Sequence, residues 1–282
     1  MLTIELKNFV SNNPQSITDD ATLEKLLIRL HATGFHHLPV VINENELVGI
    51  LSAQDVIRTV EELRVATMTL SGQTIDSLTV RESVARDIMC YHMVTVDEHS
   101  CPKHALELMI EQQINCLPII HNKSISRMLN STDFVREYSV GGFPSCDHPL
   151  SDYAHTNIPQ IEVEATLNEA LSVIMNAKTD SLVVLQDDCP LAAISRRQVR
   201  DAYCRQATGE FLGVGVDDES RSSLAGLANQ TPILSPGKCL GDAAMMMIQF
   251  GVQAIAVINQ SQRLFGVISE ADILRVMAKD WN

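Results

Sequence analysis

A short sequence pattern occurs four times along this chain, and an internal repeat restricts the possible folds more than any single motif does. The first copy, over residues 34–58, has an apolar run, a polar turn, a second apolar run and a helix start. That helix start is Ser52-Ala53-Gln54-Asp55, in which a serine precedes an acidic residue by three positions. The first apolar run recurs as Leu38-Pro39-Val40-Val41, Leu117-Pro118-Ile119-Ile120, Leu182-Val183-Val184-Leu185 and Ile255-Ala256-Val257-Ile258.

Apolar residues at helical spacing precede each of these runs at a constant distance. Every copy therefore predicts the order β-α-β-β-α and, for the whole chain, an α+β fold. The four predicted repeats cover residues 1–66, 80–139, 158–207 and 231–282.

One repeat alone could bury only one face of its small sheet, whereas two repeats side by side would share a core. We therefore expect two pseudo-twofold pairs, over residues 1–140 and 158–282. The connection 141–157 is rich in glycine, proline, serine and aspartate, which is typical of a linker. A second long polar connection is expected over residues 208–230.

Composition narrows the class of protein. The 282 residues are 45% hydrophobic, and the formal net charge of −14 argues against nucleic acid and anionic membranes as partners. No apolar run approaches the roughly 20 residues that span a bilayer, and the chain start lacks a signal-peptide pattern. The seven cysteines are scattered without a CxxC pair, which indicates free thiols and a cytoplasmic location. Histidines and cysteines show no metal-site spacing, so no metal is expected.

The second apolar run and the helix start carry a family resemblance. Gly49-Ile50-Leu51-Ser52-Ala53-Gln54-Asp55 and Gly266-Val267-Ile268-Ser269-Glu270-Ala271-Asp272 resemble the pattern of CBS domains, named after cystathionine beta-synthase. The second repeat departs with Arg127 and Asn130 but keeps Asp133, and the third has Ala192 and Gln198. Four repeats in one chain resemble the gamma subunit of AMP-activated protein kinase.

The resemblance implies a cleft between paired repeats that holds AMP, ADP, ATP or S-adenosylmethionine. The aspartate would accept hydrogen bonds from ribose, the serine and the helix start would favour phosphate, and aliphatic strand residues would face adenine. In the kinase gamma subunit, the two residues before the first run contact phosphate. The candidate ligand-binding residues are therefore His36, His37, Ile50, Ser52, Asp55, Asn115, Cys116, Asp133, Asp180, Ser181, Val267, Ser269 and Asp272.

The histidine pair predicts that the 1–140 module has the better phosphate site, because the fourth repeat has Gln253-Ala254 at the corresponding place. The resemblance implies a regulatory, adenine-nucleotide-binding protein that senses energy or metabolite levels. It would have no catalytic activity and no required cofactor, act on an unidentified protein, and be able to form a homodimer.

Four alternatives stay open. The Ser-x-x-Asp pattern can be a helix cap alone, and each aspartate is followed three residues later by an arginine that would pair with it along the helix. The clefts could be empty, which would make the chain an interaction scaffold, or the protein could be an S-adenosylmethionine-binding regulator. An unrecognised active site could also lie within residues 140–157 or 208–230, although those segments lack convergent acid–base residues.

Overall fold

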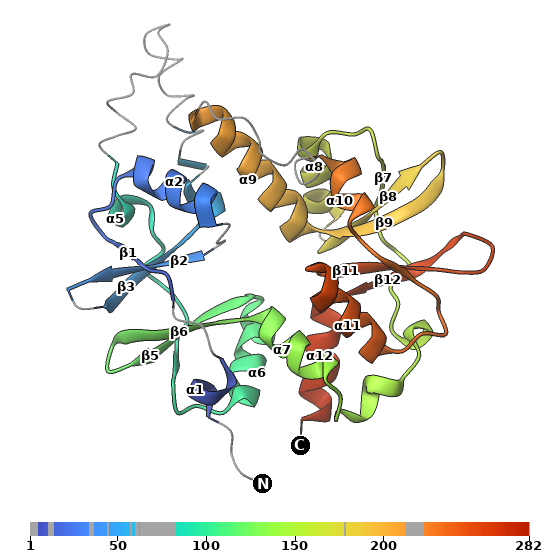
Figure 1. Cartoon of the computed structure of the whole chain (residues 1–282), viewed down its shortest axis with the longest axis horizontal. Helices are drawn as coiled ribbons and strands as arrows, with labels where there is room; N and C mark the ends of the chain where they lie inside the picture. Colours follow the sequence, from blue (N-terminus) through green and yellow to red (C-terminus); the bar gives the residue numbers. More distant parts are fainter. Residues whose placement is uncertain are drawn as a thin grey trace, which may run out of the picture. The chain divides into compact units, whose positions relative to one another are not determined.

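The computed structural model of this protein describes residues 5–10, 14–33, 37–43, 45–56, 58–59, 62, 83–177, 179–212 and 223–281. Strands and helices alternate along the chain as the repeat pattern predicts, so the expected α+β fold class is confirmed (Figure 1). No helix in these ranges is both long and apolar enough to cross a bilayer.

The chain divides into two compact units. The first consists of residues 1–105, 116–129 and 207–215, and the second of residues 106–115, 130–206 and 216–282. Residues 130–157 fall in the second unit together with the third and fourth repeats. The domain boundary expected within 141–157 stays a prediction.

The first unit is built on a sheet of order β1-β2-β3-β6-β5-β4. Strand β1 pairs in parallel with β2, β4 pairs in parallel with β5, and β3 meets β6 through Glu46 and Ser124. Asn122 and Lys123, both with positive φ, form the tight turn that joins β5 to β6. The elements of the first two repeats as far as β6 are α1 (Leu6–Phe9), β1 (Ile17–Thr18), α2 (Leu23–Thr33), β2 (His37–Ile42), β3 (Glu46–Ser52), α5 (Ala85–Ile88), β4 (Val96–Asp97), α6 (Pro102–Gln112), β5 (Cys116–His121) and β6 (Ser124–Asn130). Most of α6, from Leu106 onward, falls in the second unit.

The second unit has two three-stranded sheets, β7-β8-β9 and β10-β11-β12. Small and β-branched residues pack the two sheets together, among them Val183, Ala193, Ala256 and Val267. The elements of the third repeat are β7 (Gln160–Glu162), α8 (Leu167–Ala177), β8 (Ser181–Gln186), β9 (Cys189–Ser195) and α9 (Arg196–Leu212). Those that follow are α10 (Leu224–Asn229), β10 (Ile233–Leu234), α11 (Leu240–Phe250), β11 (Ala254–Ile258), β12 (Leu264–Ser269) and α12 (Glu270–Asp280).

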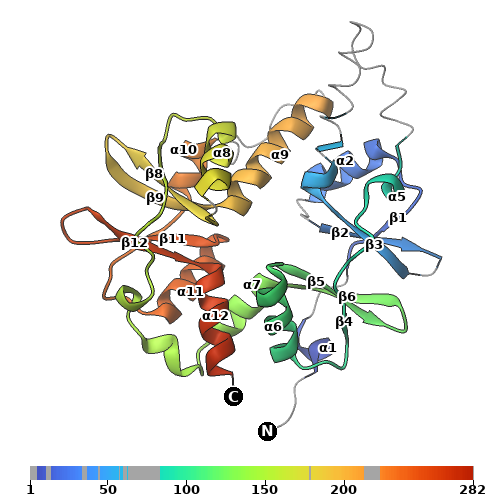
Figure 2. The same cartoon turned by 180° about the vertical axis from the view of Figure 1, so that it is seen from behind.

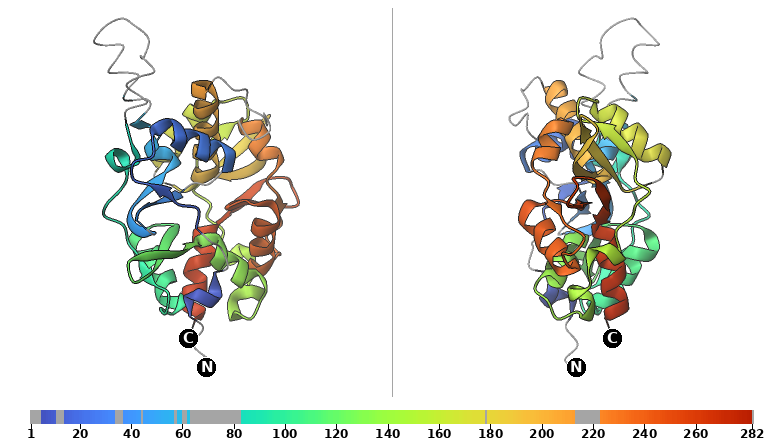
Figure 3. Two further views of the ribbon diagram at one scale, coloured as in Figure 1. Left: turned by 60° about the vertical axis from the view of Figure 1, so that its left-hand side comes forward. Right: turned by 90° about the vertical axis from the view of Figure 1, so that its right-hand side faces the viewer.

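Helix α7 (Ser131–Ser139) belongs to the second unit, where it packs beside α11 and α12 (Figure 2). Two short 3-10 turns follow it, η1 (Pro144–Asp147) and η2 (Leu150–Asp152), and η1 lies against α11 and α12 (Figure 3). Ser145 donates both its amide and its hydroxyl proton to the Asp280 carboxylate, and Leu150 is fully buried. The segment that composition marks as a linker is thus bonded to the end of the last helix.

The expectation of a polar connection over 208–230 is wrong at both of its ends. Helix α9 continues to Leu212, and α10 forms within the predicted connection. The Ser223 hydroxyl accepts a hydrogen bond from the Gly226 amide and so caps α10. Leu224, Leu227 and Ala228 are buried in the core of the third repeat, so tertiary packing supplies the stability that a helix of this length lacks alone.

Candidate functional site

The acceptor side chain of the repeated pattern caps a helix in all four repeats. In each, one of its oxygens accepts a hydrogen bond from the backbone amide three residues earlier, and the helix then begins. The helix cap that the sequence allowed as an alternative is therefore present in all four repeats. It does not require an aspartate, because Gln198 forms the same bond in the third repeat. The four bonds are Ser52 to Asp55 (3.0 Å), Asn130 to Asp133 (2.8 Å), Ser195 to Gln198 (2.9 Å) and Ser269 to Asp272 (2.9 Å).

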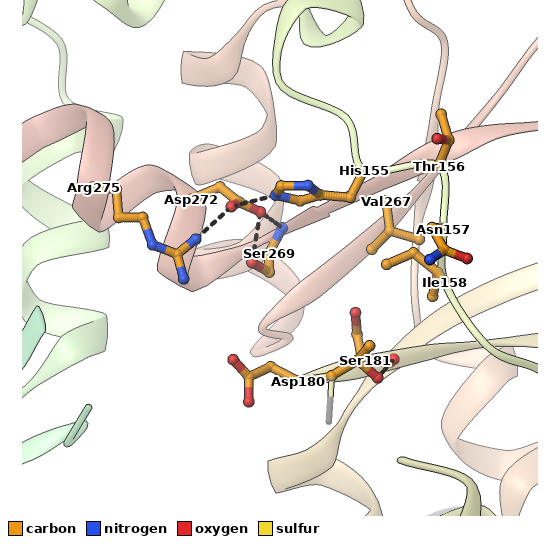
Figure 4. Close-up of a pocket in the computed structure, with 11 residues that line it drawn as sticks. His155, Thr156, Asn157, Ile158, Asp180, Ser181, Val267, Ser269, Asp272 and Arg275 are labelled. Atoms are coloured by element: carbon orange, nitrogen blue, oxygen red, sulfur yellow. Dashed lines mark hydrogen bonds and ion pairs between the residues drawn. The ribbon is translucent and has the colours of Figure 1, made fainter. Parts of the chain in front are cut away.

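Asp272 differs from Asp55 and Asp133 because its second carboxylate oxygen has two side-chain partners among the described residues, an imidazole and a guanidinium. Its Oδ1 atom lies 2.8 Å from His155 Nε2 and 2.9 Å from Arg275 Nη1 (Figure 4). Its Oδ2 atom also accepts the Ser269 hydroxyl at 2.6 Å. The Asp272 side chain is only 7% exposed, whereas His155 and Arg275 are more than half exposed. A buried carboxylate is thus covered by two side chains that are themselves more than half exposed.

The backbone brings His155 to this position. His155 and Val267 exchange two backbone hydrogen bonds, of 3.0 and 2.9 Å, so residues 154–155 run antiparallel to β12. A Cβ atom on Gly266 would lie 2.8 Å from the His155 carbonyl oxygen and 2.9 Å from Ala154 Cβ. The glycine of the repeated pattern is therefore required here for close approach of this segment.

A cavity of about 370 Å³ opens beside Asp272, within the range of small-molecule sites. It is formed entirely by the second unit, and Figure 4 shows Val267 and Ile158 on one side and Asp180 and Ser181 across from Asp272. Its walls combine aliphatic side chains with two carboxylates, an imidazole and a guanidinium. The lining residues are His155, Thr156, Asn157, Ile158, Thr179, Asp180, Ser181, Val267, Ser269, Asp272 and Arg275.

The far wall of the cavity is held by an arginine. Arg196 donates from Nε to the Thr179 carbonyl oxygen at 3.2 Å, and its Nη2 atom lies 3.4 Å from Asp180 Oδ1. The Asp180 side chain is 67% exposed, while Ser181 is buried. Asp180 therefore adds a solvated negative charge. Asp180 and Ser181 occupy the two positions of the third repeat where the resemblance implies phosphate contacts, and neither is basic.

The structure places five predicted residues around this one cavity, namely Asp180, Ser181, Val267, Ser269 and Asp272. Residues 155–158 were missed, because they lie outside the repeated pattern and only pairing with β12 brings them in. The predicted pairing of Arg275 with Asp272 is confirmed, as are the pairings of Arg58 with Asp55 and Arg136 with Asp133, each at 3.1 Å.

The predicted residues of the first repeat lie in the first unit, except that His36 falls outside the described residues. His37, at the start of β2, stands opposite Ser52 in the register of β2 and β3. The Ser52 hydroxyl donates to Asp55 Oδ2 at 2.5 Å, and the Asp55 side chain is 25% exposed. Ile50 exchanges backbone hydrogen bonds of 3.1 and 2.9 Å with Cys90. The helix start after β3 thus has the serine–aspartate cap that its sequence predicts.

The predicted residues of the second repeat are divided between the units. Cys116 is buried in an apolar cluster with Val41, Ile125 and Met128 in the first unit. In the second unit, the Asn115 carbonyl oxygen accepts the Ser131 amide at 2.9 Å. Burial raises the pKa of Asp133, and the Asn130 amide and Arg136 oppose that rise. Cys116 and Asn115 therefore have packing and backbone roles that are already satisfied.

The chain is similar in sequence and in fold to known proteins. The sequence model of the CBS domain matches residues 6–62, 85–140 and 238–279. Protein MJ1225 of Methanocaldococcus jannaschii is 21% identical over 206 residues, which cover 67% of this chain and 69% of MJ1225. Its crystal structure, described as that of a proposed archaeal homologue of g-AMPK, has a TM-score of 0.72 at 16% identity and covers 97% of this chain and all of that one.

Two further relatives match over part of the chain. A CBS domain-containing protein of Dictyostelium discoideum is 30% identical over 125 residues, which cover 43% of this chain and 81% of the relative. A homoserine O-acetyltransferase of Methanococcus vannielii is 22% identical over 120 residues. That match covers 43% of this chain but only 22% of the enzyme.

Proposed function

Because the chain belongs to the CBS-domain family, we propose that it is a regulatory protein that binds an adenine-containing ligand and has no catalytic activity of its own. The ligand classes are AMP, ADP, ATP and S-adenosylmethionine. The residues 158–207, which the family model does not match, are a fourth CBS repeat in this proposal, since their β-α-β-β-α order is that of the others. Two pseudo-twofold pairs follow from it.

One observation carries the proposal, namely the cavity in which a buried carboxylate lies beside aliphatic walls. Asp272 has the geometry to accept two vicinal ribose hydroxyls through Oδ1, while Oδ2 stays with the helix cap. Val267 and Ile158 offer an apolar surface for a purine ring. Thr156 and Asn157 add hydrogen-bonding groups at the rim.

Ligand entry would require Asp272 to exchange partners. His155 and Arg275 hold Oδ1 now, and both are more than half exposed. If ribose hydroxyls replace them, the guanidinium and the imidazole are released beside the cavity, where a phosphate group would accept hydrogen bonds from them. The same carboxylate would then select ribose and make the phosphate-binding groups available.

Calorimetric titration of ligand-stripped protein with AMP, ADP, ATP and S-adenosylmethionine tests the proposal. We expect Asp272→Asn to weaken binding about 10- to 100-fold, because a charge-assisted hydrogen bond is worth roughly 1.5–3 kcal/mol. Asparagine keeps an oxygen for the Ser269 amide, so the cap survives. Asp242→Asn is the matched control, since Asp242 caps α11 through the Cys239 amide and does not line the cavity.

An interaction scaffold is the second candidate function, and one observation favours it. Asp272 already accepts four hydrogen bonds from protein groups and needs no ligand to be satisfied. In that case none of the four ligands would bind the stripped protein. Unchanged affinity in Asp272→Asn would instead show that the ligand lies elsewhere, and a parallel Asp55→Asn variant tests the predicted preference for the 1–140 module.

The remaining parts of the proposal concern partners and location. We propose that the protein acts in the cytoplasm on a separate target protein and that it associates as a homodimer. Cross-linking of the full chain with and without ligand, followed by identification of the bound proteins, tests the target. Sedimentation of the purified chain tests the dimer, and a concentration-independent monomer would contradict it.

A further inference from the structure

Two histidines and a glutamate meet at one edge of the sheet in the first unit. Glu98 and His99 directly follow β4, and His121 is the last residue of β5. These strands are parallel neighbours, and the Glu98 amide extends their pairing by donating to the Ile120 carbonyl oxygen at 3.1 Å. Because the carboxyl ends of parallel strands share one edge, the three side chains come together although the sequence separates them.

The distances among these groups suit one metal ion. Glu98 Oε1 lies 3.0 Å from His121 Nδ1 and 3.7 Å from His99 Nε2. One ligand atom of each residue lies within 4.8 Å of the other two. Tetrahedral zinc with ligands at about 2.0–2.1 Å places them about 3.3 Å apart. Small side-chain rotations would therefore bring all three atoms into a coordination shell.

Each candidate ligand also has a partner on its other polar atom. His99 Nδ1 lies 3.2 Å from Glu5 Oε2, which favours the tautomer whose Nε2 atom can bind a metal. Glu98 Oε2 accepts the Ser126 hydroxyl at 3.0 Å, which leaves Oε1 directed at the histidines. His121 Nε2 lies 3.0 Å from Asn122 Nδ2, so metal binding through His121 Nδ1 requires the Asn122 side chain to turn its amide oxygen toward Nε2. The partners of His99 and Glu98 orient these two side chains as outer partners orient metal ligands.

We propose that Glu98, His99 and His121 bind a zinc ion, with a fourth position open to water. Two imidazoles and one carboxylate form a ligand set that zinc accepts. The carboxylate is the least exposed of the three, at 17%, and the histidines are about half exposed, so the site is reachable from solvent. The proposal revises the expectation of no metal, and it is independent of the adenine-ligand cavity.

The ion would also attach the start of the chain to the sheet edge. Glu5 contacts His99, and the next residue, Leu6, is fully buried and donates its amide to the Ser100 carbonyl oxygen at 3.1 Å. Fixing His99 on zinc would strengthen that contact. Zinc should therefore raise the melting temperature of the chelator-treated full chain, because it binds only the folded form of the site.

Titration of chelator-treated full-length protein with zinc and, separately, with cobalt tests the site. We expect one ion per chain, at least 100-fold weaker affinity in the His99→Ala/His121→Ala double variant, and weakening in Glu98→Gln. Ser126→Ala, which removes an outer partner, should weaken binding about 10-fold. His104→Ala, on an exposed position of α6, should leave affinity unchanged.

Two further readouts separate this site from the free cysteines and from misfolding. Cobalt bound here should lack an intense thiolate charge-transfer band, and affinity should fall as the pH is lowered, because only a neutral imidazole binds a metal. Circular dichroism of each variant without metal checks folding, and Glu98→Gln preserves side-chain volume. Absence of zinc binding, equal affinity in the double variant, or a persistent thiolate band would each overturn the proposal.

Discussion

The helix starts after β3 and after β12 share one local design but differ in what covers them. In both, a serine and an aspartate three residues later form the cap, an arginine pairs with the aspartate, and the strand pairs with an incoming segment. The partner of Ile50 in that segment is Cys90, whereas the partner of Val267 is His155. Only the histidine reaches the aspartate.

With this difference in the covering residue, the two carboxylates differ in exposure and in whether they border a cavity. The Asp55 side chain is 25% exposed, and the Cys90 thiol is directed to the His92 carbonyl oxygen at 3.7 Å. Asp272, under His155, is 7% exposed and borders the cavity. The repeated pattern thus specifies a cap, and the incoming segment decides whether that cap also becomes the wall of a binding site.

The largest difference in stability between the helix start after β3 and the one after β12 should come from the glycine three positions before each cap serine, Gly49 or Gly266. Gly266→Ala should lower the free energy of unfolding by about 3 kcal/mol, because the new Cβ would meet the backbone of His155, and overpacking costs about 1–3 kcal/mol. Gly49→Ala should cost nearer 1 kcal/mol, since its closest neighbours are the sulfur and Cγ of the flexible Met89 side chain. Urea unfolding of both variants measures this, and equal losses would show that the incoming segments are held equally.

The residue after the cap serine should give the next largest effect. Glu270 is buried and its Oε1 atom has no hydrogen-bond partner among the described residues, whereas the first repeat has Ala53 at the equivalent position. Burial raises the pKa of Glu270, while the Ser131 hydroxyl and Arg197 lower it and the Asp133 charge raises it further. The ionised form is therefore unfavourable in the folded state.

The sign of the pH dependence follows from that raised pKa. Stability from protonated Glu270 is present at low pH and is lost as the pH rises from the usual glutamate value through the raised one. Glu270→Gln should remove this loss and raise the free energy of unfolding at neutral pH, because glutamine has nearly the same shape and no charge to bury. Chemical unfolding across pH measures it, with exposed Glu137→Gln as control. No gain at neutral pH would show that Glu270 is paired.

The histidine itself should have the smallest effect on stability. His155→Ala should cost about 0.5 kcal/mol, because an ion pair whose histidine is largely exposed contributes little. Cys90→His should create the missing contact with Asp55 and gain no more than that amount. Thermal melting at low and high salt measures both. A loss in His155→Ala as large as that in Gly266→Ala would mean that His155 is mainly structural.

The local features of this protein were determined by its sequence. Apolar spacing and β-branched runs predicted the strands and helices, and the Ser-x-x-Asp spacing predicted the caps at Asp55 and Asp272, because these depend on residues a few positions apart. Helix α10 escaped prediction, since its stability comes from the core that buries Leu224 and Leu227.

The sites themselves were decided by the tertiary structure. His155 and Asp272 stand 117 positions apart and meet only because residues 154–155 pair with β12 beside Gly266. Likewise, His99 and His121 have no recognisable ligand spacing until parallel pairing of β4 and β5 brings them to one sheet edge. A short sequence pattern predicts the hydrogen bonds that a residue makes with residues a few positions away in the chain. Contacts between distant segments depend on strand pairing and register, which no short stretch of sequence contains.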